Sequence, residues 1–219
     1  MHGILCIVII EKSSWLSTRI LMPKTILIWD NDGTVMGSAN PNDSSHQAKI
    51  LLPNVQRLME IEGIINIICS GCKTPESELQ NFDPQRVIER FTALMNKLPI
   101  SLATFSPAIG GTQCYVVIKH SSADDLEIRT AHEDQRYMHL VGQFKKPGIG
   151  MLMVIQDLLQ ELYQIEDRTN LFFIGDTWHD EHAARAMTIP FIPAQQIHGL
   201  SEDVEFDAEQ FIRLAGMKP

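Results

Sequence analysis

Short runs of apolar, often β-branched residues alternate along the chain with segments of helical periodicity. Runs that end at turn residues predict strands at 25–29, 64–69, 171–174 and 189–192, and weaker runs predict strands at 100–105 and 115–118. Helical spacing predicts helices at 47–62, 84–97, 148–163, 179–187 and 207–215. This alternation favours an α/β fold, with a doubly wound, mostly parallel sheet covered by helices on both faces.

Two segments depart from this rhythm. Residues 106–144 contain one β-like run, several histidines and few helix signals, which indicates a small inserted hairpin or lid beside the core. Near the N-terminus, residues 3–10 are apolar but lack a preceding Lys or Arg, so the charged region of a signal peptide is missing. Either residues 1–21 begin with a buried or edge strand, or the natural start is Met22. We expect one domain over residues 22–219, with 1–21 as an extension.

The composition of the chain excludes several classes of protein. With 219 residues, 44% of them hydrophobic and 21% charged, it resembles an ordinary globular domain. Its formal net charge of -9 gives no basic footprint for nucleic acid or an anionic membrane. No apolar run approaches the roughly 20 residues of a membrane span, and four cysteines fit a reducing compartment better than a disulfide scaffold. We therefore expect a cytoplasmic protein.

Two carboxylates follow the first strong strand directly. Asp30 and Asp32 lie in the run Asp-Asn-Asp-Gly-Thr, where the two negative charges repel each other unless a cation or a phosphate reaction uses them. Mg²⁺ prefers hard oxygen ligands of this kind. One aspartate could attack phosphorus, and the other could act as general acid and then as general base. Gly33 would allow the tight turn that brings the backbone close to a phosphate. A plain polar turn is the alternative.

Polar residues also follow two other predicted strands. Ser70 comes after the strand at 64–69, and Gly175-Asp176 with Asp180 comes after the strand at 171–174. Ligands of doubly wound sheets bind beyond the carboxyl ends of the strands, so these side chains are expected to converge. Taken alone, Asp176 could be a simple helix cap.

Together these motifs resemble those of the haloacid-dehalogenase superfamily, in its phosphatase branch. The second aspartate of the first motif, Asp32, is absent from the dehalogenases of the superfamily. The resemblance implies that Asp30 is the nucleophile, that Ser70 with Gly71 binds the phosphoryl group, and that Asp176 is a direct Mg²⁺ ligand. Asp180 would support the ion or its waters, and the Asp30 carboxylate and the Asp32 main-chain carbonyl would also contact it.

The superfamily also requires a lysine at the start of a helix, and Lys146 in Lys-Pro-Gly-Ile-Gly-Met fits this motif. Pro147 suits the first turn of a helix, and the ammonium group would offset the crowded carboxylates. Lys145 is the rival. The form KPxxGM is similar to that of histidinol-phosphatase-like, heptose-bisphosphate-phosphatase-like and polynucleotide 3′-phosphatase-like proteins, which favours Lys146.

The resemblance implies a Mg²⁺-dependent phosphatase that hydrolyses a phosphate monoester through an aspartyl-phosphate intermediate. A phosphorylated small molecule is the expected substrate, and a phosphorylated nucleic-acid end is the alternative. A phosphotransferase or phosphomutase, or a non-catalytic binding protein, would use the same fold. Cys69 and Cys72 form a CxxC pair, but Cys114 and the histidines of 106–144 do not complete a zinc pattern. Cys69 is expected in the core, and Cys72 at a helix start or facing a lid.

Overall fold

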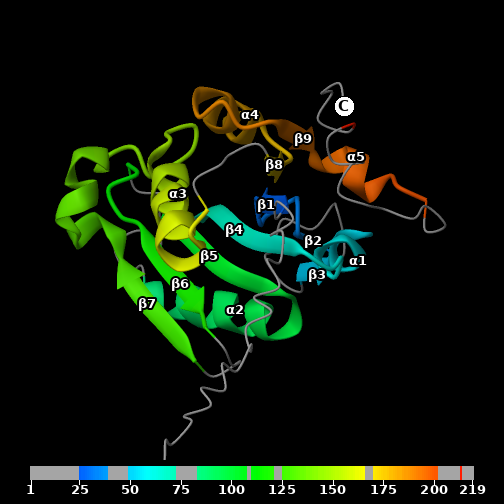
Figure 1. Ribbon diagram of the computed structural model, residues 1–219, viewed down its shortest axis with the longest axis horizontal. Helices are drawn as coiled ribbons and strands as arrows, with labels where there is room; N and C mark the ends of the chain where they lie inside the picture. Colours follow the sequence, from blue (N-terminus) through cyan, green and yellow to red (C-terminus); the bar gives the residue numbers. More distant parts are fainter. Residues whose placement is uncertain are drawn as a thin grey trace, which may run out of the picture.

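A computed structural model of the chain describes residues 25–38, 49–72, 83–107, 110–120, 125–165, 170–201 and 213. Seven strands form one sheet in the order β7-β6-β5-β4-β1-β8-β9 (Figure 1). They are β1 (Thr25–Trp29), β4 (Ile64–Cys72), β5 (Ile100–Pro107), β6 (Tyr115–Lys119), β7 (Leu126–Thr130), β8 (Leu171–Gly175) and β9 (Phe191–Pro193). Five neighbouring strands of the sheet, β5, β4, β1, β8 and β9, are parallel to one another. The predicted α/β class, with its mostly parallel sheet, is confirmed.

Helices cover both faces of this sheet. They are α1 (Val55–Met59), α2 (Pro84–Lys97), α3 (Gly150–Tyr163), α4 (Trp178–Ala186) and α5 (Ala194–His198), with 3₁₀ turns η2 (Ala131–Glu133) and η3 (Gln135–Leu140). Helices α3 and α4 pack into one core cluster, whereas α1, α2 and α5 pack into the other. Figure 1 shows α3 and α2 on opposite sides of the central strands. None of the described helices is long and apolar enough to cross a membrane.

Strand β1 divides its side chains between the two cores. Ile26 and Ile28 join the cluster under α3 and α4, and Leu27 and Trp29 join the cluster under α1 and α2. Successive side chains of a strand point to opposite faces, so a run that is apolar throughout is required where helices cover both faces. This explains why the four residues before Asp30, Ile26 to Trp29, are all apolar. All five residues of the strand are buried.

An asparagine inside the sheet joins several elements. Asn66 of β4 accepts a hydrogen bond from the indole Nε1 of Trp29 at 3.0 Å. Its own amide nitrogen donates to the main-chain oxygens of Met59, at the end of α1, and Pro99, just before β5, at 2.8 and 3.2 Å. Asn66 is 1% exposed. A buried polar group is tolerated where its hydrogen-bonding capacity is used, as it is here.

The segment 106–144 extends the sheet. Strands β6 and β7 add to its edge, each antiparallel to its neighbour. Tyr115 and Val117 of β6 belong to one core cluster, whereas Cys114 and Phe144 belong to the other. Much of the described part of this segment is therefore core. The predicted domain limits of 22–219, with an extension at 1–21, stay a prediction because residues 1–24 lie outside the described residues.

The predicted elements are confirmed in large part, with local corrections. Helix α2 has the predicted bounds, Pro84–Lys97. The helix predicted at 47–62 is wrong at its start, because β3 (Lys49–Leu51) pairs there antiparallel with β2 (Met36–Ser38), and only α1 remains helical. Helix α3 begins at Gly150, so Pro147 precedes the helix instead of lying in its first turn. The helix predicted at 207–215 lies outside the described residues except at Arg213.

The cysteine predictions have a mixed outcome. Cys69 is fully buried in the core, as predicted. Cys72 is the last residue of β4 and is buried in the opposite core cluster, so the prediction of a helix-start or lid-facing residue is wrong. The strand continues three residues beyond its predicted end because Ser70, Gly71 and Cys72 pair with β5.

Candidate active site

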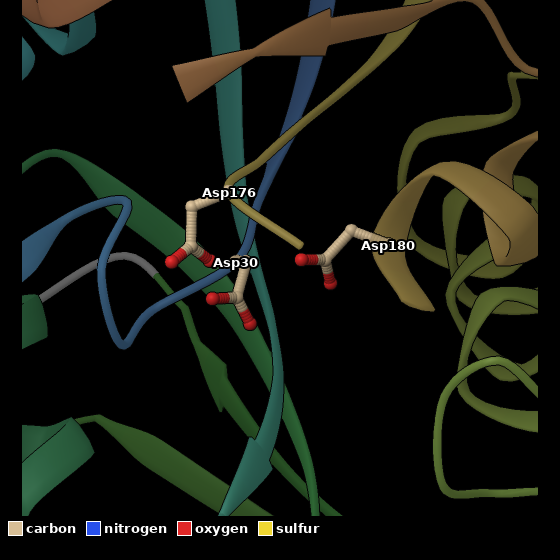
Figure 2. Close-up of side chains that lie close together, drawn as sticks. All are labelled: Asp30, Asp176 and Asp180. Carbon is tan, nitrogen blue, oxygen red and sulfur yellow. The ribbon is translucent and has the colours of Figure 1, made fainter. Parts of the chain in front are cut away.

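Three carboxylates converge beyond the carboxyl ends of the neighbouring strands β1 and β8 (Figure 2). Asp30 follows β1, Asp176 follows β8, and Asp180 lies in the first turn of α4. One oxygen of each carboxylate lies within 4.8 Å of the others. After β1 the chain adds β4 and β5 on one side and β8 and β9 on the other, so the cluster marks the point where the strand order reverses. Ligands of such sheets bind at this point.

A single ammonium group lies against these carboxylates. Nζ of Lys146 donates to Oδ1 of Asp30, forms an ion pair with Oδ1 of Asp180, and donates to the main-chain oxygen of Cys69 at 3.1 Å. Lys146 is 8% exposed, whereas the neighbouring Lys145 is exposed. Of the two lysines considered from the sequence, the structure brings Lys146 into the cluster.

For both Asp30 and Lys146, burial and the charge of the partner shift the pKa in opposite directions. Burial raises the pKa of Asp30, the Lys146 ammonium lowers it and the Asp180 carboxylate raises it again, so that the pKa lies at about 6. For Lys146, burial lowers the pKa, but the nearby Asp30 and Asp180 carboxylates outweigh it and the pKa is raised. Lys146 therefore stays charged, while the Asp30 carboxylate is poorly compensated. Three carboxylates face one ammonium group, and a further cation would neutralise part of this excess negative charge.

Two motif positions require glycine, because an aspartate side chain packs against each of them and leaves no room for a Cβ. A Cβ on Gly33 would lie 2.1 Å from Oδ2 of Asp176, and Gly33 has a φ of +95°, in the region that favours glycine. A Cβ on Gly175 would lie 2.5 Å from Cβ of Asp180. The sequence predicted a tight turn at Gly33. Its close approach to Asp176, however, depends on the pairing of β1 with β8, which local sequence does not reveal.

Asp180 also begins helix α4. Its Oδ2 accepts hydrogen bonds from the main-chain nitrogen and the hydroxyl of Thr177, at 3.1 and 2.6 Å, and Thr177 caps the helix in return. This is the reciprocal arrangement of a capping box. Oδ1 is meanwhile paired with Lys146. Asp180 is 1% exposed. Sequence reasoning did not identify Thr177 as a capping residue, although the spacing of Thr177 and Asp180 is a recognisable capping signal.

Asp32 lies apart from the three clustered carboxylates. Its Oδ1 accepts hydrogen bonds from Nδ2 of Asn31 at 2.9 Å and from Nη2 of Arg90 at 2.7 Å. Arg90 comes from α2, 58 residues away along the chain. Asn31 and Arg90 therefore hold the side chain of Asp32. Its predicted metal contact through the main-chain carbonyl stays a prediction. Sequence reasoning missed Arg90 because an arginine on an amphipathic helix is an ordinary surface residue.

Ser70 and Gly71 lie beside the lysine. Ser70 is 1% exposed and follows Cys69, whose carbonyl oxygen accepts from Lys146. A Cβ on Gly71 would lie 3.8 Å from Cε of Lys146, so the lysine stem passes over this glycine. Strand β4 thus places both residues next to the cluster. Their predicted role in binding a phosphoryl group stays a prediction.

The donor set fits Mg²⁺. Carboxylate oxygens on three neighbouring backbone segments are hard ligands, and Mg²⁺ is usually held by one or two carboxylates, with water and phosphate completing the shell. Asp30 and Asp176 are the better placed to hold the ion directly, because both oxygens of Asp180 already have partners. Among the described residues this is the one group of His, Cys, Asp or Glu side chains close enough to hold a metal.

No family model and no curated protein matches the chain. Among solved structures, it is similar to D,D-heptose 1,7-bisphosphate phosphatase from B. bronchiseptica, complexed with magnesium and phosphate, at 17% identity and a TM-score of 0.43 over 86% of this chain and 98% of that one. It is also similar to trehalose-6-phosphate phosphatase from Aspergillus fumigatus, at 12% identity and a TM-score of 0.36 over 88% and 91%. Similarities this low leave the function to be argued from the site residues.

Proposed function

We propose that the chain is a Mg²⁺-dependent phosphatase of the haloacid-dehalogenase type, which hydrolyses a phosphate monoester through an aspartyl-phosphate on Asp30. The observation that carries the proposal is the buried Asp30 carboxylate at the end of β1, held by Lys146 and clustered with Asp176 and Asp180. Four sequence motifs in the superfamily order contribute these residues. A phosphorylated small molecule fits better than a nucleic-acid end, because the formal net charge is -9.

The reaction would proceed in two displacements. An oxygen of Asp30 attacks phosphorus, a new O–P bond forms, and the bond to the leaving oxygen breaks while Asp32 donates a proton to that oxygen. Asp32 then removes a proton from water, whose oxygen attacks phosphorus and displaces Asp30 to release inorganic phosphate. Asn31 and Arg90 would hold the Asp32 carboxyl group through Oδ1 in both steps, so that Oδ2 carries the proton that is donated and then recovered.

The remaining site residues supply charge and position. Mg²⁺, when held by Asp30 and Asp176, would neutralise negative charge on the phosphoryl oxygens. Lys146 would hold the Asp30 carboxylate in place and offset the same charge, and Ser70 would donate its hydroxyl to a phosphoryl oxygen. Positioning and charge stabilisation account for most of the catalysis of phosphoryl transfer, so a rigid, buried cluster suits the task.

The proposal is tested by phosphate release from p-nitrophenyl phosphate and a panel of sugar phosphates, nucleotides and 3′-phosphorylated oligonucleotides. We expect turnover with Mg²⁺, none with EDTA, and a loss of at least about 10³-fold in Asp30→Asn. Asp125→Asn, which alters an exposed aspartate just before β7, is the matched control and should keep full activity. No turnover on the whole panel would contradict the proposal, and phosphate transfer only to an added alcohol would indicate a phosphotransferase.

A further inference from the structure

Arg90, on α2, contacts a proposed catalytic group, Asp32. Its Nη2 donates to Oδ1 of Asp32 at 2.7 Å, and its side chain is 41% exposed. The guanidinium carbon also lies 6.0 Å from the centre of the Phe91 ring. In the described part of the chain, Asp32 is the hydrogen-bond acceptor found for this arginine. A guanidinium has five N–H donors, so most of them remain for a ligand.

The proposed role of Asp32 indicates which part of the substrate lies near Arg90. A general acid that protonates the leaving oxygen must lie on the leaving-group side of phosphorus. A side chain hydrogen-bonded to that acid therefore lies near the part of the substrate that departs. Lys146, in contrast, is 8% exposed and has three oxygen partners, so it is committed to the cluster.

Charge argues for a specific kind of leaving group. The formal net charge of -9 and the clustered carboxylates repel a substrate that carries a second negative group. A half-exposed guanidinium beside Asp32 opposes this repulsion locally, and its planar fork matches the two oxygens of a carboxylate or phosphate. An alcohol leaving group without charge would gain much less from it.

We propose that Arg90 is a specificity residue that binds a second anionic group, a carboxylate or a phosphate, on the leaving portion of the substrate. This inference rests on the proposed phosphatase function. It distinguishes two contributions of one side chain: holding Asp32, which affects every substrate equally, and binding the second anion, which affects only substrates that carry one.

Two matched pairs of esters separate these contributions. In the first, 3-phosphoglycerate is compared with glycerol 3-phosphate, so that a carboxylate replaces a hydroxymethyl group. In the second, fructose 1,6-bisphosphate is compared with fructose 6-phosphate. For each pair, kcat/KM of the anionic member is divided by kcat/KM of its partner, in the Mg²⁺-loaded protein and its variants. Any change in Asp32 cancels in this ratio.

We expect Arg90→Met to lower the ratio by about 10- to 100-fold in at least one pair, mainly by raising KM of the anionic member. Arg90→Lys should give an intermediate ratio, because it keeps the charge and loses the fork. Lys97→Met removes an exposed positive charge from the last turn of the same helix and should leave both ratios unchanged. The pair that responds tells whether the second group is a carboxylate or a phosphate.

Unchanged ratios in both pairs, or equal losses for both members of each pair, would overturn the inference and leave Arg90 with the positioning of Asp32 alone. Both outcomes are compatible with a working phosphatase. If the unaltered protein released no phosphate from the four esters or from any member of the panel that tests the proposed function, that function would fail, and the inference with it.

Discussion

At the scale of single residues, the site is dominated by an imbalance of charge. Three carboxylates converge on one ammonium group, and Lys146 contacts two of them. Removing one partner of a buried ion pair leaves the other charge uncompensated, which costs more than the pair contributes when intact. The cluster is therefore sensitive to the loss of its cation.

The first prediction concerns this lysine. Lys146→Met should lower the free energy of unfolding of the metal-free protein by about 3–5 kcal/mol, because Asp30 and Asp180 lose their buried partner. Lys145→Met, which alters the exposed neighbouring residue, should change it by less than about 0.5 kcal/mol. Urea denaturation in EDTA measures both. Equal effects of the two substitutions would mean that the cluster does not depend on Lys146.

The second prediction uses two glycines with similar backbone angles. Gly33 and Gly63 have φ of +95° and +84°, but a Cβ would meet Asp176 only at Gly33 and meets nothing within 4 Å at Gly63. Alanine at either position should cost about 1 kcal/mol or more through backbone strain. Only Gly33→Ala should also abolish Mg²⁺-dependent phosphate release, because it displaces the Asp176 carboxylate. Retained activity in Gly33→Ala would show that this carboxylate can move without consequence.

At the scale of elements, Asn66 connects β1, the strand that precedes Asp30, with α1 and the start of β5. Its replacement by leucine should destabilise the protein by at least about 1–3 kcal/mol, because the buried indole N–H of Trp29 is left unpaired. Ser101→Ala is the control, since its hydroxyl donates to the main-chain oxygen of Asn66 at 3.3 Å from a partly buried position. It should cost less than about 1 kcal/mol. Chemical denaturation tests both, and similar losses would contradict this view of Asn66.

The sequence predicted those elements whose pattern is local. The apolar run of β1 and the amphipathic spacing of α2 determine their structures without distant partners, and both bounds are confirmed. The hairpin of β2 and β3 was missed, since short strands depend on their pairing more than on propensity. Residues 39–48, which connect them, lie outside the described residues.

The same distinction holds within the site. Asp30, Asp176 and Asp180 could be predicted because each follows a strand in a recognisable motif, and the sheet brings them together. Arg90 could not, because nothing in the pattern of α2 separates it from Arg86 one turn earlier, which is exposed and faces Asp83. Which arginine meets Asp32 depends on how α2 packs on the sheet.

At the scale of the whole molecule, the buried Asp30 links stability to pH. Its pKa is raised from 3.8 to about 6 by burial, against the attraction of Lys146. Between these values the native protein keeps a proton that the unfolded chain has released, so stability falls as pH rises through this window. The metal-free protein should lose about 3 kcal/mol from this group over the whole titration, from about pH 3 to about pH 7.

Because other carboxylates titrate in the same range, the measurement is the difference between the unaltered protein and Asp30→Asn. In EDTA, the stability of the unaltered protein relative to the variant should fall from pH 4 to pH 7, and Mg²⁺ should restore it increasingly above pH 6, where the carboxylate can bind the ion. Denaturant titrations at four pH values are sufficient. A pH-independent difference would show that Asp30 titrates normally.

The two structural roles of Asp180 have a practical consequence for capturing a substrate complex. Its carboxylate caps α4 through Thr177 and pairs with Lys146 through its other oxygen, so an inactive variant made at this position would also loosen the helix and give a poor trap. Asp30 has no part in a helix cap, and asparagine has nearly its shape. Crystallographers seeking a bound ester should therefore start from Asp30→Asn and leave Asp180 intact.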